Sequence, residues 1–579
     1  MLKIFRNNLK TYRLMIAFVF LLVFLQSLSE LYLPTLMADI VNIGILEGDT
    51  GYILRLGGLM LLVTAAGVLF SIAASYYSSS IASSFGKRIR SKLFSHVEHF
   101  SLQEFDKIGT ASLITRTTND VTQVQQVLIM ILRMMVMAPM MCIGGIIMAV
   151  SKDATLSLVF VVVVPVLAGA ILWIGSRSVA LFKAMQLKID KLNLVLREGL
   201  TGIRVIRSFH RTGFEQRRFD AANKDLTETA IKVNKIMAFM MPIMMLILNF
   251  SSVAILWFGS IRISNNDMQI GDLMAFLQYA MQIMFSLIMV AMMFIMLPRA
   301  SVSAARINEV LGMKPGIQDA AATGQTTGRE VKEGTVEFRE VTFSYPGAEK
   351  PALSGISFTA VRGETTAIIG GTGSGKSTLV NLIPRFYDVE AGSVRIDGMD
   401  IRNLTQQSLR AKIGYVPQQA VLFTGTISEN IRYGKEDASD EEVSHAAKIA
   451  QAASFIAEMP DGFDTVIAQG GTNVSGGQKQ RLSIARALVR RPEIYIFDDS
   501  FSALDFKTDA QLRAALKEET RDAAVIIVAQ RVSTVIHADK IIVLDEGEIA
   551  GIGTHSELLQ ACEVYREIVS SQLSEEEIA

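Results

Sequence analysis

A glycine-rich run between residues 370 and 377 has the composition of a phosphate-binding loop. It reads Gly370, Gly371, Thr372, Gly373, Ser374, Gly375, Lys376 and Ser377, and Thr378 follows it. An apolar strand-like run precedes it and an apolar helical run follows it, which argues against a chance glycine-rich turn. The glycines let backbone N–H groups curl around phosphates, and the helix start adds positive potential. Lys376 would neutralise the β- and γ-phosphates of ATP, and Ser377 would ligate Mg²⁺.

Two further residues are candidates for the same nucleotide site. Asp498 ends the apolar run 494–497, which is where a carboxylate must lie to hold Mg²⁺. Tyr345 lies upstream, where its ring could stack on adenine, although an ordinary strand aromatic is the alternative. We therefore expect ATP and Mg²⁺ as ligands.

A second turn with phosphate-binding character consists of Ser475, Gly476, Gly477 and Gln478. A Ser-Gly-Gly turn that opens a helix offers a hydroxyl and N–H groups to an anion. With this turn the chain resembles the ABC transporter family. The resemblance implies that the turn is the family's signature motif, which binds the γ-phosphate of ATP held by the other ATPase domain of a pair.

Further matches extend the resemblance over essentially the whole chain. Gln418 corresponds to the family's Q-loop glutamine, which implies roles in catalysis and in Mg²⁺ coordination, and the segment 502–505 corresponds to the D-loop. Six spans followed by one ATPase domain is the layout of a bacterial half-exporter. The resemblance therefore implies a membrane α-helical domain of six transmembrane helices, of the type IV ABC exporter kind, fused to an α/β P-loop ABC ATPase domain.

The ATP site departs from the family pattern at two positions. Asp499 stands where the family usually has the Glu that orients the attacking water, and Gln530 stands where it usually has His. The shorter side chain withdraws the carboxylate by about 1 Å, and such misplacement can cost about 100-fold in rate. Glutamine cannot carry a proton as histidine does. The resemblance thus implies the degenerate-site subunit of a heterodimeric multidrug-type exporter, paired with a second half-exporter subunit; a slow homodimer is the alternative.

Composition agrees with a membrane protein. Half of the 579 residues are hydrophobic and the mean hydropathy is +0.35, which soluble proteins rarely reach. The formal net charge is zero, which argues against nucleic acid as a partner. Cys142 and Cys562 lie far apart and indicate neither a disulfide framework nor a metal cluster.

Long apolar stretches predict six spans of a multi-pass cell-membrane protein. They lie near residues 14–40, 54–84, 128–150, 154–176, 238–262 and 272–298. Lys and Arg gather in alternate loops, so the positive-inside rule predicts that both termini are cytoplasmic. A signal peptide is the alternative for the basic, apolar start, but that run continues beyond Leu33 without a small-residue cleavage site.

We expect three regions along the chain. Residues 1–315 form the transmembrane domain, whose long internal loops extend the helices into the cytoplasm. Residues 316–333 form a linker, because the stretch around 320–328 is small, polar and without periodicity. Residues 334–579 form the nucleotide-binding domain, because short β-type runs alternate there with helices.

The membrane domain suggests a class of cargo. Methionine is dense in the third, fifth and sixth spans, which suits a surface that accepts many ligand shapes, with core or lipid-facing packing as the alternative. Glu30 and Arg133 lie within apolar stretches and are expected to face a cavity, with snorkelling as the alternative for Arg133. We expect ATP-driven export of amphipathic small molecules, drugs or lipids, by a protein surrounded by membrane lipid. A lipid or peptide exporter, homodimeric or heterodimeric, and an ATP-gated regulatory ABC protein remain alternatives.

Overall fold

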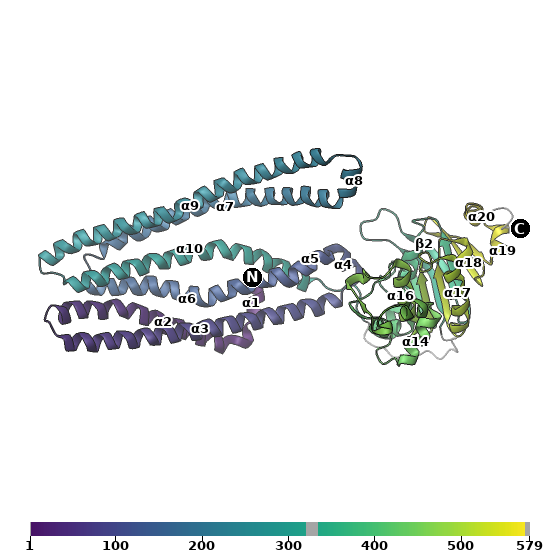
Figure 1. Ribbon diagram of the computed structural model, residues 1–579, viewed down its shortest axis with the longest axis horizontal. Helices are drawn as coiled ribbons and strands as arrows, with labels where there is room; N and C mark the ends of the chain where they lie inside the picture. The colour runs from purple at the N-terminus through teal and green to yellow at the C-terminus, as the bar shows by residue number, and fades with distance from the viewer. Residues whose placement is uncertain (1, 320–333, 574–579) are drawn as a thin grey trace. The chain divides into compact units, whose positions relative to one another are not determined.

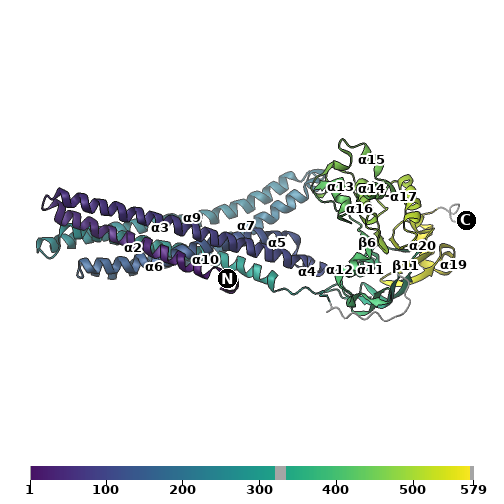
Figure 2. The ribbon, with the colours of Figure 1, turned by 90° about the horizontal axis from the view of Figure 1, so that it is seen from below.

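The structure, a computed structural model, describes residues 2–319 and 334–573 (Figures 1 and 2). Most of the predicted linker 316–333 therefore lies outside the described residues. The chain divides into two compact units. The first contains Met1–Glu98 and Ala111–Met313, and the second contains His99–Thr110 and Lys314–Ala579. A short segment inside the helical half of the sequence thus folds with the C-terminal half.

The first unit is built almost entirely of helices. They are α1 (Leu2–Asn8), α2 (Arg13–Asp39), α3 (Thr50–Glu98), α5 (Thr110–Thr115), α6 (Val121–Lys152), α7 (Leu158–Thr201), α8 (Ile203–Ser208), α9 (Thr212–Ser264) and α10 (Ile270–Gly312). Short 3₁₀ and π-helical turns at Lys10–Tyr12, Ile40–Ile45 and Arg116–Asp120 extend α2 at both ends and join α5 to α6.

Six helical segments of this unit are long and apolar enough to cross a membrane. They run over Lys10–Ile45, Thr50–Glu98, Thr110–Lys152, Leu158–Thr201, Thr212–Ser264 and Ile270–Gly312. These segments correspond to the six spans that the sequence predicts. At 1.5 Å per residue, the 49 residues of α3 extend about 70 Å, more than twice the ~30 Å hydrocarbon core.

The helices of this unit pack in two groups. Figure 1 shows α7 and α9 lying side by side and diverging from α2, α3, α6 and α10 towards the short helix α8. The groups meet near the loops at the other end of the hairpin, where Phe160 of α7 stacks on Phe276 of α10 with ring centroids 5.1 Å apart. Tyr279 is fully buried there, and its hydroxyl lies 2.7 Å from Thr35 Oγ1.

Ion pairs fix the same end of the bundle. The buried carboxylate of Asp153, in the loop between α6 and α7, accepts a hydrogen bond from Arg262 of α9 at 3.0 Å. Lys152 pairs with Asp272 of α10 at 2.9 Å. These contacts join the ends of the long helices α6, α9 and α10 in addition to the loops that connect them.

The second unit contains three β-sheets. A four-stranded antiparallel sheet has the order β2-β1-β4-β5, a six-stranded sheet has the order β12-β11-β3-β10-β9-β6, and β7 pairs with β8. The strands are β1 (Val336–Phe343), β2 (Leu353–Ala360), β3 (Thr365–Gly370), β4 (Ala391–Ile396), β5 (Met399–Asp400), β6 (Ile413–Val416), β7 (Gly425–Thr426), β8 (Val466–Ile467), β9 (Ile494–Asp498), β10 (Ala524–Val528), β11 (Lys540–Asp545) and β12 (Glu548–Gly553).

Helices surround these sheets. They are α4 (Leu102–Ile108), α11 (Lys376–Leu382), α12 (Gln406–Ala411), α13 (Ile427–Arg432), α14 (Asp440–Ile449), α15 (Ala453–Ala457), α16 (Gly476–Leu488), α17 (Phe506–Glu519), α18 (Val532–Val535), α19 (His555–Ala561) and α20 (Glu563–Ser570). The six-stranded sheet is parallel apart from its edge strand β12. Its central strands β9 and β10 are buried along their whole length, as continuous apolar runs in a covered parallel sheet should be.

Candidate functional site

The register of the central sheet brings three strand ends together. Val528, the last residue of β10, pairs with Ile368 of β3 on one side and with Asp498 of β9 on the other. The strands are parallel, so the loops that follow them leave from the same edge of the sheet, where ligands bind in open α/β folds. These loops carry the glycine-rich run, Asp499 and Gln530.

The glycine-rich run connects β3 to α11 in a backbone conformation that requires glycine. Gly373 and Gly375 have φ angles of +87° and +95°, in the left-handed region that side chains rarely adopt. A Cβ atom on Gly370 would lie 2.2 Å from the carbonyl oxygen of Leu544, and one on Gly375 would lie 2.8 Å from that of Ala352. Side chains at these two positions would therefore clash with the backbone of neighbouring segments.

Lys376 and Ser377 stand at the beginning of α11 and face the carboxylate of β9. Lys376 Nζ donates hydrogen bonds to the carbonyl oxygens of Gly370 at 2.9 Å and Gly371 at 2.6 Å. Burial lowers the pKa of Lys376, although the nearby carboxylates oppose that shift. Ser377 Oγ donates to Asp498 Oδ1 at 3.0 Å. Burial raises the pKa of Asp498, and Asp499 beside it adds to this effect.

This group of residues fits Mg²⁺ and a nucleotide phosphate. A hydroxyl and a carboxylate in contact are the hard oxygen ligands that Mg²⁺ prefers. Among the described residues, the buried Ser374 Oγ in the loop has no hydrogen-bond partner. This hydroxyl could therefore donate to a bound phosphate. Thr372 is exposed at the tip of the loop, between Gly371 and Gly373.

Asp499 is held by two amides. Its Oδ2 accepts hydrogen bonds from Gln530 Nε2 at 2.9 Å and from Gln418 Nε2 at 3.3 Å. Its backbone has a φ of 45°, an unusual left-handed conformation for a residue with a side chain, and its carbonyl accepts from Ser502 Oγ at 2.9 Å. Burial raises the pKa of Asp499, while the bonds from Gln418 and Ser502 act against that shift.

Tyr345 is packed beside the beginning of α11. Its hydroxyl lies 3.0 Å from Thr378 Oγ1, and its ring makes edge-on contacts with Phe343 and Tyr387, with centroids 5.0 Å and 5.5 Å apart. The residue is 37% exposed. A partly exposed ring held from three sides remains able to stack on a base.

The Ser-Gly-Gly turn forms the start of α16. Ser475 Oγ accepts from the backbone N–H of Gln478 at 3.3 Å, and Ser475 N–H donates to Gln478 Oε1 at 2.8 Å. This reciprocal cap leaves Ser475 and Gly476 exposed. Among the residues that the structure describes, no hydrogen bond joins this turn to the glycine-rich run. The structure thus gathers the other candidates in one place and leaves this turn free at the surface.

Sequence reasoning missed Gln572, which positions the loop after β10. Its Nε2 donates to the carbonyl oxygen of Gln530 at 2.8 Å, and its Oε1 accepts from the N–H of Val532 at 2.8 Å. Gln572 belongs to no motif and follows Gln530 by 42 residues, so nothing in the sequence pointed to the contact.

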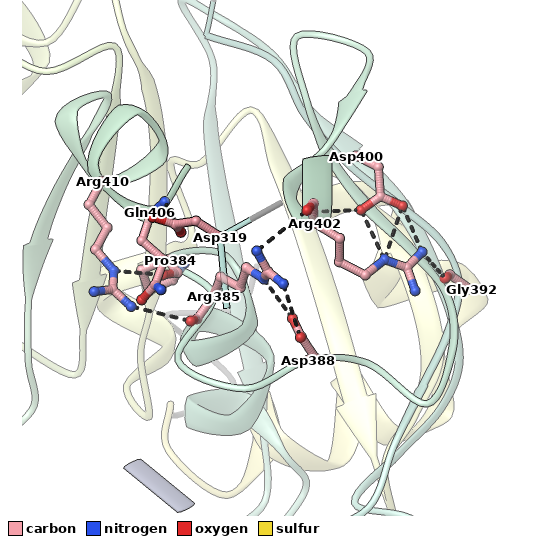
Figure 3. Close-up of polar contacts among 9 residues, drawn as sticks. All are labelled: Asp319, Pro384, Arg385, Asp388, Gly392, Asp400, Arg402, Gln406 and Arg410. Atoms are coloured by element: carbon pink, nitrogen blue, oxygen red, sulfur yellow. Dashed lines mark hydrogen bonds and ion pairs between the residues drawn. The ribbon is translucent and has the colours of Figure 1, made fainter. Parts of the chain in front are cut away.

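The loop after α11 has its own polar framework, which is drawn in Figure 3. The buried guanidinium of Arg385 donates to both carboxylate oxygens of Asp388, at 2.7 Å and 3.1 Å. Arg410 donates to the carbonyl of Pro384 at 3.1 Å, and Asp319 accepts from the N–H of Gln406 at 2.9 Å. The last of these bonds ties the chain that leaves α10 to the start of helix α12 in the second unit.

The helix α4 also folds with this unit. It comprises Leu102–Ile108 and lies in the segment His99–Thr110. Glu104 is buried, accepts the N–H of Gly316 at 3.2 Å and caps α4 through Ser101 at 2.7 Å. Burial raises the pKa of Tyr387 to about 12, and Asp106 of α4 adds to the shift.

Comparisons with known proteins assign both units. Residues 16–299 match the family described as "ABC transporter transmembrane region", and residues 353–502 match "ABC transporter". The chain is 45% identical over 575 residues to an uncharacterized ABC transporter ATP-binding protein of Mycobacterium tuberculosis (strain CDC 1551 / Oshkosh), which covers 99% of this chain and 98% of that protein. It is 32% identical over 560 residues to the ATP-dependent lipid A-core flippase of Vibrio cholerae, with 95% and 94% covered.

A solved structure has the same fold. It is a bacterial Atm1-family ABC exporter with ATP bound, with a TM-score of 0.81 and 27% sequence identity. The match covers 97% of this chain and 99% of that one.

Proposed function

This chain belongs to the ABC transporter family as an exporter half-transporter, and from that premise we propose that it works as the weakly hydrolysing subunit of a heterodimer that exports amphipathic small molecules. ATP hydrolysis in its ABC domain is coupled to transport, and exporters of this family work as dimers. The finer parts of the proposal concern the partner, the division of labour between the two ATP sites, and the cargo.

Two exposed surfaces support a partner subunit. The turn at Ser475 and Gly476 is open, with its hydroxyl and helix start available to a phosphate held by another chain. Large apolar side chains are exposed at the α8 end of the α7–α9 hairpin, among them Val205, Phe209 and Phe214. A second subunit would cover such residues, because monomeric proteins rarely expose apolar patches of this kind.

The hydrogen bond between Asp499 and Gln530 is the observation that supports weak ATP hydrolysis at this site. A hydrolytic base must direct its carboxylate at water, but the Asp499 oxygen Oδ2 is shared by two amide donors at 2.9 Å and 3.3 Å. Gln530 has no group that accepts and passes on a proton at neutral pH. We propose that this site binds Mg·ATP through Ser374, Lys376, Ser377 and Asp498, while the partner's site, completed by Ser475, carries most of the turnover.

The cargo proposal is supported by the membrane unit and by one relative. The flippase of Vibrio cholerae is named for a lipid substrate, which favours an amphipathic cargo for this chain. The methionines divide into two groups. Met244 and Met284 are buried in a cluster with Leu167, whereas other members stay exposed, including Met135, Met241, Met245 and Met281. The second group could contact cargo or lipid; the first packs the bundle.

ATP turnover by the chain alone tests the heterodimer. The chain is purified with and without a second half-exporter whose ATP site has Glu and His at the two positions. We expect turnover near background for the chain alone and full turnover for the pair. Turnover of the lone chain at the rate of the pair would establish a homodimer instead. Uptake of a fluorescent amphiphile into inverted vesicles, driven by ATP, would separate an exporter from an ATP-gated regulatory protein.

The positive-inside rule supports a cell-membrane orientation in which both termini are cytoplasmic. Protease accessibility of the ATPase unit in sealed inverted vesicles tests this orientation directly. Cleavage without detergent is expected, because that unit would lie on the outside of such vesicles.

A further inference from the structure

A serine-lined cavity lies on one face of the long helix α3. Its volume is about 550 Å³, within the range of about 300–1,000 Å³ typical of small-molecule sites. It is lined by Ile72, Ser75, Tyr76, Ser79, Ser80 and Ser83. Hydroxyls at this density are unusual in a segment apolar enough to cross a membrane, because each needs a hydrogen-bond partner that lipid chains do not offer.

Helix α6 places two donor side chains against serines that line this cavity. Arg133 Nη1 lies 3.5 Å from Ser75 Oγ, and Gln125 Nε2 lies 3.3 Å from Ser83 Oγ. Gln125 and Arg133 are eight residues, about 12 Å, apart along their helix. The two donors therefore stand at opposite ends of the serine stripe.

The charge of Arg133 is not balanced by the protein around it. Among the described residues, Arg133 makes one long side-chain hydrogen bond, to Ser75, and forms no ion pair. Helix α6 contains no Asp or Glu, and α3 contains one, Glu98, at its last residue. A guanidinium in an apolar span is costly unless an acidic group or water compensates its charge.

The charged side chains of α3 and α6 nearest to the cavity have one sign. Four basic residues follow the cavity along α3, at Lys87, Arg88, Arg90 and Lys92. An arginine with hydroxyls and an amide forms a set of donors that matches the oxygens of a phosphate or carboxylate. A cationic amphiphile would meet repulsion here and would find no carboxylate on either helix before Glu98.

We propose that this cavity is a subsite for the acidic headgroup of an amphipathic anion, with Arg133 as the charged contact and Ser75 as the hydroxyl beside it. The apolar part of the ligand lies along Ile72 and Tyr76, which are 60% and 69% exposed. This inference names a cargo class for the proposed exporter and so rests on the proposed function. A bilayer lipid and a free amphipathic acid share the required chemistry.

Equilibrium binding to the full chain in nanodiscs tests the subsite. Dodecyl phosphate is the probe, dodecyltrimethylammonium is its cationic counterpart, and the nanodisc lipid is phosphatidylcholine. We expect Arg133→Gln to weaken binding of dodecyl phosphate by about tenfold or more, the value of one charge-assisted hydrogen bond. Arg133→Lys should retain part of the affinity, Ser75→Ala should lose less than Arg133→Gln, and Arg55→Gln, an exposed arginine elsewhere on α3, should bind as wild type.

The outcomes separate the possibilities. Equal binding of dodecyl phosphate to wild type and to Arg133→Gln, or equal binding of the two probes to wild type, would overturn the subsite. If Arg133→Gln does not fold, Arg133→Lys and Ser75→Ala replace it, and binding of dodecyl phosphate equal to wild type by both variants would overturn the subsite. Competition by phosphatidylglycerol placed in the nanodisc would identify a bilayer lipid as the source of the headgroup. A lack of competition would identify a free amphipathic acid. Binding without any ATP-driven transport of dodecyl phosphate would leave the subsite standing and refute the proposal that amphipathic anions are exported.

Discussion

Gln530 donates its side-chain amide to Oδ2 of Asp499 at 2.9 Å, across the ends of two neighbouring parallel strands. Gln418 reaches the same oxygen from a third strand, at 3.3 Å. One carboxylate oxygen of Asp499 therefore accepts hydrogen bonds from two neutral amides, which cannot take up a proton. The arrangement favours a carboxylate fixed in place over one that moves with an attacking water.

Restoring the family's usual residues should create turnover at this site. We expect Asp499→Glu with Gln530→His to raise ATP hydrolysis of the complex, by up to about 100-fold at this site, because misplacement of a catalytic group by ~1 Å costs about that much. Steady-state phosphate release measures the effect. Adding Lys376→Ala should remove the gain, since Lys376 belongs to this site alone.

Each single change has a smaller expected effect. Asp499→Glu alone leaves Gln530 opposite the longer carboxylate, and Gln530→His alone leaves the carboxylate short. If either single variant reaches the rate of the double variant, the two residues do not work as a unit, and the assignment of a doubly degenerate site fails.

Three substitutions should rank in a fixed order in the complex. Ser475→Ala should be the most severe, because in the proposed heterodimer it removes a γ-phosphate contact from the partner's site, and one charge-assisted bond contributes roughly 1.5–3 kcal/mol. Lys376→Ala should weaken nucleotide occupancy here and slow the cycle. Asp499→Asn should change little. Steady-state ATPase gives the order; abolition by Asp499→Asn together with a mild Ser475→Ala would show that the two sites are reversed.

Much of the fold followed from the sequence because its causes are local. The compact apolar runs at 366–369, 493–497 and 524–528 correspond to β3, β9 and β10. The six apolar stretches correspond to the six candidate spans, and the helices run on past them, as α3 does to Glu98. Polar residues there lower the hydropathy but keep the helical propensity, so hydropathy alone underestimates helix length.

The contacts that define the candidate site did not follow from the sequence. Gln418, Asp499 and Gln530 meet because β6, β9 and β10 are neighbours in the sheet, and strand order is a property of the whole unit. Helix α4 is joined to the ATPase unit by a partly buried hydrogen bond from Gly316 to Glu104, 212 residues earlier. Burial of Met244 and Met284 depends on which helix faces meet, and methionine composition cannot indicate that.

Binding of Mg·ATP should depend on pH through Asp498. Burial raises the pKa of Asp498, so the folded site holds this proton more tightly than a solvent-exposed aspartate with a pKa of about 3.9 does. As the pH falls through the raised pKa, the carboxylate becomes neutral and cannot ligate Mg²⁺. The Mg²⁺-dependent part of ATP affinity should therefore be lost at a higher pH than an ordinary aspartate would give.

Fluorescent ATP binding from about pH 8 down to about pH 4, just above the ordinary aspartate pKa of about 3.9, with Mg²⁺ or with EDTA, measures this dependence. The curve with Mg²⁺ should fall towards the EDTA curve as the pH decreases. Asp498→Asn should lie near the EDTA curve throughout. A gap between the two curves that stays constant over the whole range would contradict a carboxylate with a raised pKa as the metal ligand.

Arg262 offers a matched pair of tests for the membrane unit, because it contacts one buried and one exposed carboxylate. Asp153 is 2% exposed, lies 3.0 Å from Arg262 Nε and also accepts the N–H of Leu156 at 2.8 Å, whereas Asp267 is 47% exposed and lies 3.2 Å from Nη1. Asp153→Ala leaves Arg262, which is 30% exposed and keeps Asp267, so its cost should lie below the about 3–5 kcal/mol of an unpaired buried charge. It should still exceed the about 0–1 kcal/mol of a surface pair, because the bond to Leu156 is lost as well. We expect Asp153→Ala to lower the thermal unfolding midpoint far more than Asp267→Ala does. Tryptophan fluorescence of the chain in nanodiscs measures the midpoint. Equal midpoints for the two variants would mean that the Asp153–Arg262 pair does not hold the ends of α6 and α9 together.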